Sequence, residues 1–362
     1  MQEHGSDLMR IVFLTMAIVF ELAIGTPALD AQVNPINYVF FGRDRDSIRT
    51  AAFLQKPFFA GAQITYPWRL LEPKQDQYDF SSIESDLEWL GNRGKKLFVQ
   101  LQDVSFEESI VNVPNYLRTD SYGQGVNRQY SFANDNDDKA EPAGWVARRW
   151  DSRVAARYSK LLSALGALFD GRIAGLNMPE TAVDFGSTGK YFPPGFSPST
   201  YRDAIKSYMR AAKNAFSKSA VIQYANFMPG EWLPWDDKGY LRSVYEYGKA
   251  IGVGLGGPDL KVFKKAQMNH SYALLPGLSG IVPTGIAIQY GNYEELNPQT
   301  GKAVTIDDIY RFGRDLIKVN YLFWSIQEPY FSRDLIPYCI YSALRPTAMM
   351  DHVLQVRPVC YR

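Results

Sequence analysis

Short apolar runs alternate with amphipathic stretches along most of the chain, beginning near residue 38. Apolar runs rich in β-branched and aromatic side chains are typical of buried strands. We identify eight such runs, which are Tyr38–Phe41, Ala60–Tyr66, Leu97–Leu101, Ile173–Leu176, Ala220–Ala225, Val253–Leu255, Gly285–Tyr290 and Tyr321–Trp324. Strands separated by amphipathic segments predict βα units around a parallel sheet.

Helical periodicity and capping residues mark the segments between these strands. The predicted helices are Ser81–Asn92 with a capping box of Ser81 and Glu84, Arg153–Phe169, a helix that begins at Ser197-Pro198, Thr305–Val319 with Thr305 and Asp308 as caps, and a last helix near Ala343–Leu354. Eight strands with intervening helices predict an α/β fold, a single-domain (β/α)₈ barrel. Such a barrel needs about 250 residues, so residues 32–362 leave room for long loops after the strands, at 103–151 and 181–198.

The N-terminal region resembles a secretory signal peptide. An apolar run, Ile11–Ile24, is too short to cross a bilayer and precedes small residues that end at Ala28 or Ala31. We therefore expect residues 1–31 to be removed and the mature chain to be secreted or periplasmic. Met9 is the better start, because Arg10 then precedes the apolar run. An uncleaved membrane anchor is the alternative, although no second apolar run of spanning length follows.

Composition narrows the classes of partner. The chain is 46% hydrophobic, 14% aromatic and 21% charged, which excludes bulk disorder. Lys and Arg number 39 against 38 Asp and Glu, so no basic excess exists to hold a nucleic acid, and a neutral, hydroxyl-rich ligand is expected. With only three His, a His-based metal site is poorly supported, and no cofactor is expected. Cys339 and Cys360 either form a disulfide or remain buried thiols.

One motif carries a family resemblance. Tyr66-Pro-Trp68, Glu72-Pro73 and Tyr78-Asp-Phe80 follow the second predicted strand. This run resembles one found in several families of the barrel-fold retaining glycoside hydrolases of clan A. The resemblance implies a carbohydrate substrate and hydrolysis by two carboxyl groups. Within the run, we interpret Glu72 as a turn or ion-pair residue and Trp68 as a side chain that lines a cleft.

The resemblance also implies catalytic residues at strand ends. Glu180 follows the fourth strand, shortly after Asn177, where the clan places its general acid/base. The clan's nucleophile is a Glu at the end of strand seven, but Gln289 occupies that point here. We therefore keep Glu294 and Glu328 as the leading candidates for the second carboxylate. Asp259 and Glu231 are further options for the second carboxylate, and Asp184 is the spare candidate for the general acid/base.

Aromatic and amide side chains recur after the strands, where sugars would stack and form hydrogen bonds. The predicted substrate-binding residues are Trp68, Gln102, Asn177, Asn226, Trp232, Tyr290 and Trp324, and Trp235 belongs to the same aromatic set. Trp324 resembles the clan's tryptophan at the floor of the sugar subsite. The sequence predicts a secreted glycoside hydrolase. The alternatives are a non-catalytic glycan-binding barrel that lost its nucleophile and, more remotely, a lyase-like or metal-dependent barrel enzyme. The oligomeric state stays open.

Overall fold

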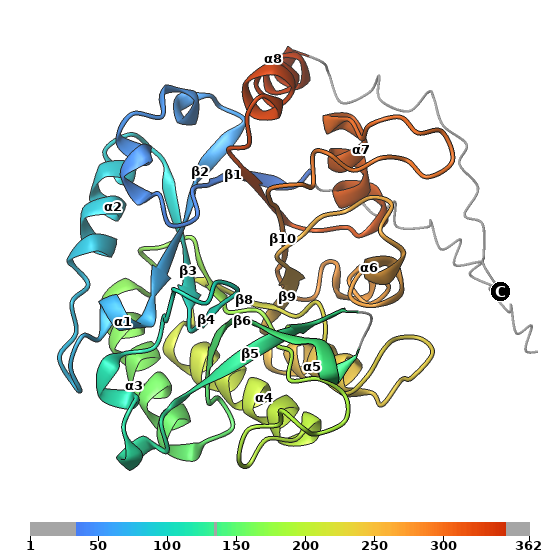
Figure 1. Cartoon of the computed structure of the whole chain (residues 1–362). Coiled ribbons are helices and arrows are strands. Elements are labelled where there is room, and N and C mark those ends of the chain that lie inside the picture. Colours follow the sequence, from blue (N-terminus) through green and yellow to red (C-terminus); the bar gives the residue numbers. More distant parts are fainter. Residues whose placement is uncertain (1–33, 134–135, 345–362) are drawn as a thin grey trace, which may run out of the picture. The chain divides into compact units, whose positions relative to one another are not determined.

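The computed structural model describes residues 34–133 and 136–344. Within these ranges, eight parallel strands close into a barrel (Figure 1). In barrel order they are β1 (Ile36–Phe40), β2 (Phe59–Pro67), β3 (Lys96–Gln102), β7 (Gly175–Met178), β8 (Ala220–Tyr224), β9 (Gly254–Gly257), β10 (Thr284–Ile288) and β11 (Tyr321–Ser325). Each of the eight predicted apolar runs overlaps one of these strands, so the predicted (β/α)₈ barrel is confirmed.

The barrel interior has an aromatic layer. Tyr38, Phe98 and Phe323 meet there, with ring centroids 4.9 to 5.8 Å apart. Gly175 lies opposite Phe98 in the strand register, and a Cβ at Gly175 would come within 2.3 Å of the Phe98 ring. A glycine is therefore required on β7 if the large ring of β3 is to fill the barrel. Because this layer fills the barrel, it forms the floor beneath the open carboxyl ends of the strands.

Helices surround the barrel (Figure 1). They are α1 (Trp68–Leu71), α2 (Ser81–Gly91), α3 (Ser152–Phe169), α4 (Pro198–Ala215), α5 (Tyr240–Ile251), α6 (Lys265–Asn269), α7 (Ile306–Arg311) and α8 (Ile336–Leu344), with π-helical turns at Phe312–Leu316 and Phe331–Leu335. The caps at Ser197 and Thr305 form as predicted. The cap predicted at Ser81 does not form, because α2 starts at that residue and the Asp79 carboxylate accepts its backbone N–H instead.

A small antiparallel sheet occupies the region that the sequence predicts as a long polar loop. It consists of β4 (Val104–Ser105), β5 (Val126–Phe132) and β6 (Ala140–Ala147), in the order β4-β6-β5. Pro142 and Gly144 in β6 obscure the strand pattern in the sequence, and the pairing of β5 with β6 shifts register beside them. The sheet belongs to the segment that follows β3, and it lies at the carboxyl end of the barrel.

Some predictions fall outside the described residues. The signal peptide, Cys360 and most of the predicted helix Ala343–Leu354 lie there, so the disulfide stays a prediction. Cys339 is buried in α8, which begins earlier than the sequence predicts. Across residues 34–133 and 136–344, no helix has both the length and the apolar character of a membrane span.

Candidate active site

Polar side chains replace the aromatic layer toward the carboxyl ends of the strands. Gln63 donates a 3.0 Å hydrogen bond to the Tyr224 hydroxyl, and Thr65 donates one of 2.7 Å to Gln100. Asn177 is fully buried and pairs in register with Gln100, next to Tyr224. Strand alternation turns these side chains inward, on the same face as the aromatic floor. The mouth of the barrel is therefore lined with hydroxyl and amide groups.

Glu180 lies just beyond β7 at this mouth. Its side chain is partly buried, and its Oε2 accepts a 3.0 Å hydrogen bond from the Asn226 side chain, which follows β8. Burial raises the pKa of Glu180 from 4.5 to about 7. The amide of Asn226 and the cation of Arg149 lower this pKa, and the charge of Asp259 raises it. A carboxyl group of this kind is half protonated near neutral pH and can both give and take a proton.

A buried ion pair, Arg149 with Asp103, holds the backbone at Glu180 in place. The Arg149 guanidinium forms two hydrogen bonds with Asp103, of 3.0 and 2.5 Å, and both side chains are buried. The Nη1 group of Arg149 donates one hydrogen bond to the Glu180 carbonyl at 2.8 Å and another to the Tyr201 hydroxyl at 2.6 Å. The Tyr201 hydroxyl in turn donates to the Thr181 carbonyl at 3.1 Å. This network fixes the loop that carries Glu180, and no sequence pattern singled out Arg149.

Asp259 is the carboxylate whose charge acts on Glu180. It follows β9, is partly exposed, and its Oδ1 accepts a 3.1 Å hydrogen bond from the Asn292 side chain. The Asn292 oxygen accepts from the backbone of Leu260 at 3.1 Å and of Gln289 at 2.9 Å. Asn292 therefore ties the loops after β9 and β10 together and orients Asp259. From the sequence, Asp259 is only a further option for the second carboxylate.

The other candidate carboxylates have different partners. Glu294 is exposed and accepts a 2.6 Å hydrogen bond from Gln327. Glu328 is exposed and binds Ser332 within its own loop. Glu231 accepts three backbone N–H groups at the start of α5, from 2.6 to 3.2 Å, so its role is structural. Asp184 is exposed and accepts from the Gly186 N–H at 2.9 Å.

Two predicted sugar-binding tryptophans lie away from the barrel mouth. Trp68 is 1% exposed, packs on Tyr158 and donates a 2.9 Å hydrogen bond to Glu72. Trp324 is 0% exposed and donates to Asn37 at 2.8 Å. Neither ring can reach a substrate here, which corrects the expectation that both line the cleft. Glu72, buried in an ion pair with Arg157, is the structural residue that the sequence predicts.

The remaining predicted residues are better placed. Asn226 and Gln102 each have a buried side-chain oxygen without a hydrogen-bond partner among the described residues. Tyr290 is 72% exposed beyond β10, and its hydroxyl donates to the Ile326 carbonyl at 2.9 Å. A buried oxygen without a partner costs free energy that a ligand hydroxyl recovers. Asn226 and Gln102 therefore have unused capacity to bind a polar ligand.

A groove of about 780 Å³ includes Ala182, two residues beyond Glu180 in the chain. It is lined by residues that follow Glu180 and Asn226 along the chain, and by β5 of the small sheet. Within it, Trp232 is 49% exposed and stacks on Phe227, with the ring planes 9° apart. His270 packs against both rings at 4.6 Å, and burial lowers its pKa to about 4. Together the three rings form an uncharged aromatic platform. Of the three, the sequence predicts only Trp232 as a binding residue.

The closed parallel barrel carries a glutamate and amides at its carboxyl end. The barrel fold that the sequence resemblance implies is therefore confirmed. The catalytic domain of beta-amylase from Paenibacillus polymyxa superposes with a TM-score of 0.57 at 11% identity, covering 86% of this chain and 99% of that domain. GH5_18 from Streptomyces cattleya, solved in complex with GlcNAc, gives 0.48 at 12% identity, covering 82% and 71%. No protein-family model and no curated sequence matches the chain.

Proposed function

We propose that this protein is an exported glycoside hydrolase that cleaves O-glycosidic bonds in a polysaccharide or oligosaccharide, with Glu180 as general acid/base. One observation carries the proposal: the Glu180 carboxyl lies at the carboxyl end of the barrel, held by Asn226 and supported by Arg149. Its pKa of about 7 suits a group that must donate a proton and later accept one. The shared fold supports the class of enzyme.

The proposed reaction has two steps, following the retaining course that the sequence resemblance implies. Protonated Glu180 gives its proton to the glycosidic oxygen as the bond to the anomeric carbon breaks, and a second carboxylate bonds to that carbon. The Glu180 carboxylate then takes a proton from water, and the resulting hydroxide displaces the second carboxylate. Each group ends in its starting protonation state.

We propose Asp259 as the second carboxylate. Its charge acts on Glu180, and Asn292 holds its orientation at 3.1 Å. Glu294 and Glu328, the leading candidates predicted from the sequence, are exposed. Glu294 accepts a hydrogen bond from Gln327 beyond β11, and Glu328 accepts one from Ser332 in the π-helical turn that follows. They are the competing candidates for the same role, and single replacements separate the three.

The substrate is proposed to lie along the groove. Trp232 offers a flat apolar ring for the C–H face of a sugar, and the free oxygens of Asn226 and Gln102 offer acceptors for hydroxyl groups. Tyr290 offers a second exposed ring beyond β10. A groove of about 780 Å³ has room for more than one sugar ring, so an oligosaccharide is the expected substrate.

Export is part of the proposal and rests on residues 1–31 alone. The apolar run Ile11–Ile24 and the small residues up to Ala31 support a cleaved signal peptide. N-terminal sequencing of the protein recovered from the periplasm or medium should begin after Ala28 or Ala31. An N-terminus upstream of Met9 on a retained, unprocessed chain would contradict both the export and the proposed start.

The experiment that tests the function measures reducing ends released from a panel of plant, algal and microbial polysaccharides. The wild type is compared with Asp259→Asn, Glu294→Gln and Glu328→Gln. Hydrolysis that Asp259→Asn lowers at least a thousandfold, while the two glutamate variants stay near wild type, supports the proposed pair. If a glutamate variant is inactive and Asp259→Asn is not, the assignment of Asp259 is wrong. The anomeric configuration of the first product, read by NMR, tests retention.

A non-catalytic glycan-binding barrel is the second candidate. The observation that favours it is Gln289, which stands where the resemblance expects the nucleophile and carries no charge. Under this hypothesis the groove binds oligosaccharides, but no member of the panel releases reducing ends. Calorimetric binding without hydrolysis by the wild type would decide for it.

A further inference from the structure

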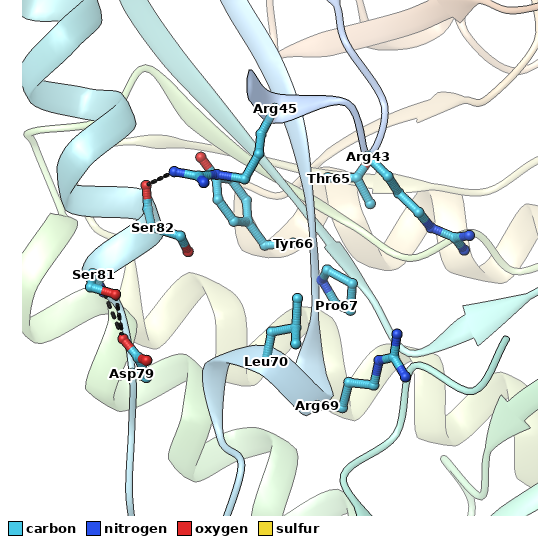
Figure 2. Close-up of a pocket in the computed structure, with 10 residues that line it drawn as sticks. All are labelled: Arg43, Arg45, Thr65, Tyr66, Pro67, Arg69, Leu70, Asp79, Ser81 and Ser82. Carbon is cyan, nitrogen blue, oxygen red and sulfur yellow. Dashed lines mark hydrogen bonds between the residues drawn. The ribbon is translucent and has the colours of Figure 1, made fainter. Parts of the chain in front are cut away.

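A second cavity, of about 380 Å³, lies at the carboxyl ends of β1 and β2 (Figure 2). The cavity follows the carboxyl end of β2, and Glu180 follows that of β7, so both lie at the same end of the parallel barrel. Only β3 separates the two strands. Three of the ten residues that line it are arginines: Arg43, Arg45 and Arg69. A basic pocket stands out in a chain whose formal net charge is only +1.

Arg45 is committed to the fold. Its guanidinium forms two hydrogen bonds of 2.9 Å with Asp86, which is fully buried. Asp86 also accepts hydrogen bonds from Arg49 at 2.7 Å and from the Tyr66 hydroxyl at 2.8 Å. Arg45 also contacts Asp46 at 3.4 Å, so its charge is paired within the fold, and this arginine forms a wall of the pocket.

Arg43 and Arg69 are not committed in this way. Figure 2 shows both extending to one side of β2, whereas Arg45 lies on the other. Arg43 makes one contact of 3.5 Å with Glu107, and both side chains are largely exposed, so this ion pair is weak. Among the described residues, the side chain of Arg69 has no ion pair, while its backbone N–H is fixed by the Asn112 carbonyl at 2.8 Å.

The one acidic residue that lines the cavity does not neutralise these arginines. Asp79 lies on the far side of β2 (Figure 2), where its carboxylate accepts hydrogen bonds of 2.6 and 3.0 Å from Ser81. These hydrogen bonds lower the pKa of Asp79. Arg43 and Arg69 therefore offer two guanidinium groups, and a guanidinium matches the paired oxygens of a carboxylate.

We propose that Arg43 and Arg69 form a subsite for the carboxylate of a uronic acid, so that the natural ligand is an acidic oligosaccharide. The proposal rests on the proposed function, because it assumes that a glycan lies across this end of the barrel. It revises the neutral ligand that the net charge suggests. The local charge of the pocket, rather than the total charge of the chain, decides which sugar fits.

The test measures binding by calorimetry to a panel of uronate oligosaccharides: oligogalacturonate, oligomannuronate, oligoguluronate and glucuronoxylan fragments. Each is paired with its carboxyl-reduced form, which has the same linkages without the charge. A sulfated oligosaccharide is included. Wild type is compared with Arg43→Gln/Arg69→Gln and with a control, Arg202→Gln/Arg333→Gln. The control removes one partly exposed and one exposed arginine, each paired with its chain neighbour.

At least one uronate oligosaccharide should bind the wild type and the control about equally. Carboxyl reduction, or the Arg43→Gln/Arg69→Gln variant, should weaken that binding at least about tenfold, as expected for a charge-assisted contact. Equal binding of acidic and reduced forms would overturn the proposal, as would binding of the sulfated oligosaccharide alone. Neutral chains cleaved in a Glu180-dependent way, with no preference for uronates, would refute the subsite and leave the proposed function standing. Arginine-dependent uronate binding without hydrolysis would support the subsite and contradict the proposed hydrolysis.

Discussion

The side-chain amide of Asn226 donates a 3.0 Å hydrogen bond to Oε2 of Glu180, joining the ends of β7 and β8. This contact lowers the pKa of Glu180, whereas burial raises it. Burial is the largest effect and, together with the charges of Asp259 and Arg149, leaves Glu180 with a pKa of about 7. The Asn226 hydrogen bond thus helps to set the pH at which this carboxyl group changes its charge.

The first prediction concerns the pH dependence of activity. The general acid must hold its proton, and Glu180 loses it as the pH rises through about 7. The turnover number should therefore fall tenfold per pH unit on the alkaline side. Asn226→Ala removes a contact that lowers the pKa, so the alkaline limb should move to higher pH. Turnover measured from pH 4 to 10 for both proteins checks this, and an alkaline limb that Asn226→Ala leaves unmoved would contradict it.

The second prediction concerns stability. The Glu180 pKa is about 7 in the folded protein against an ordinary value of 4.5, so between these values the folded state holds a proton that the unfolded chain has released. Stability contributed by this group is complete below pH 4.5 and is lost as the pH rises through 7. Glu180→Gln cannot ionise, so at pH 8 its free energy of unfolding should exceed that of the wild type by about 3 kcal/mol. Guanidinium melts at pH 4 and 8 measure the difference, which should vanish at pH 4.

The third prediction concerns the buried pair of Arg149 and Asp103. Arg149→Met leaves the Asp103 charge buried without its partner and should cost about 3–5 kcal/mol of stability. Arg153→Met is the matched control, because the Arg153–Asp151 pair is largely exposed on the arginine side and should contribute under about 1 kcal/mol. Denaturant melts compare the two. Equal losses would show that the pair beneath Glu180 is no more important than a surface ion pair.

The fourth prediction separates the tryptophans. Trp232→Ala removes the exposed ring of the groove and should raise KM for an oligosaccharide about tenfold or more, with little change in melting temperature. Trp324→Phe removes the hydrogen bond to Asn37 and should lower the melting temperature without changing KM. A KM effect confined to Trp324→Phe would restore the position that the sequence analysis gives this residue.

The sequence predicts the barrel well because each strand is a local apolar run. It cannot say which face of such a strand points inward, because strands of a parallel barrel are apolar on both faces. Phe323 and Trp324 are neighbours in β11, yet Phe323 belongs to the aromatic floor and Trp324 packs on the outer face. The sequence also did not indicate Asn292 or Arg149, because their importance comes from contacts between loops that are far apart in the sequence.

The central claim is that Glu180 supplies the proton for glycosidic cleavage. The most direct test measures reducing ends released at pH 6 by the wild type and by Glu180→Gln, on whichever polysaccharide of the panel the wild type degrades. The predicted result is a loss of at least a thousandfold, with the melting temperature of the variant equal to or above that of the wild type. Hydrolysis by Glu180→Gln at the wild-type rate, or no hydrolysis of any polysaccharide by the wild type, would contradict the claim.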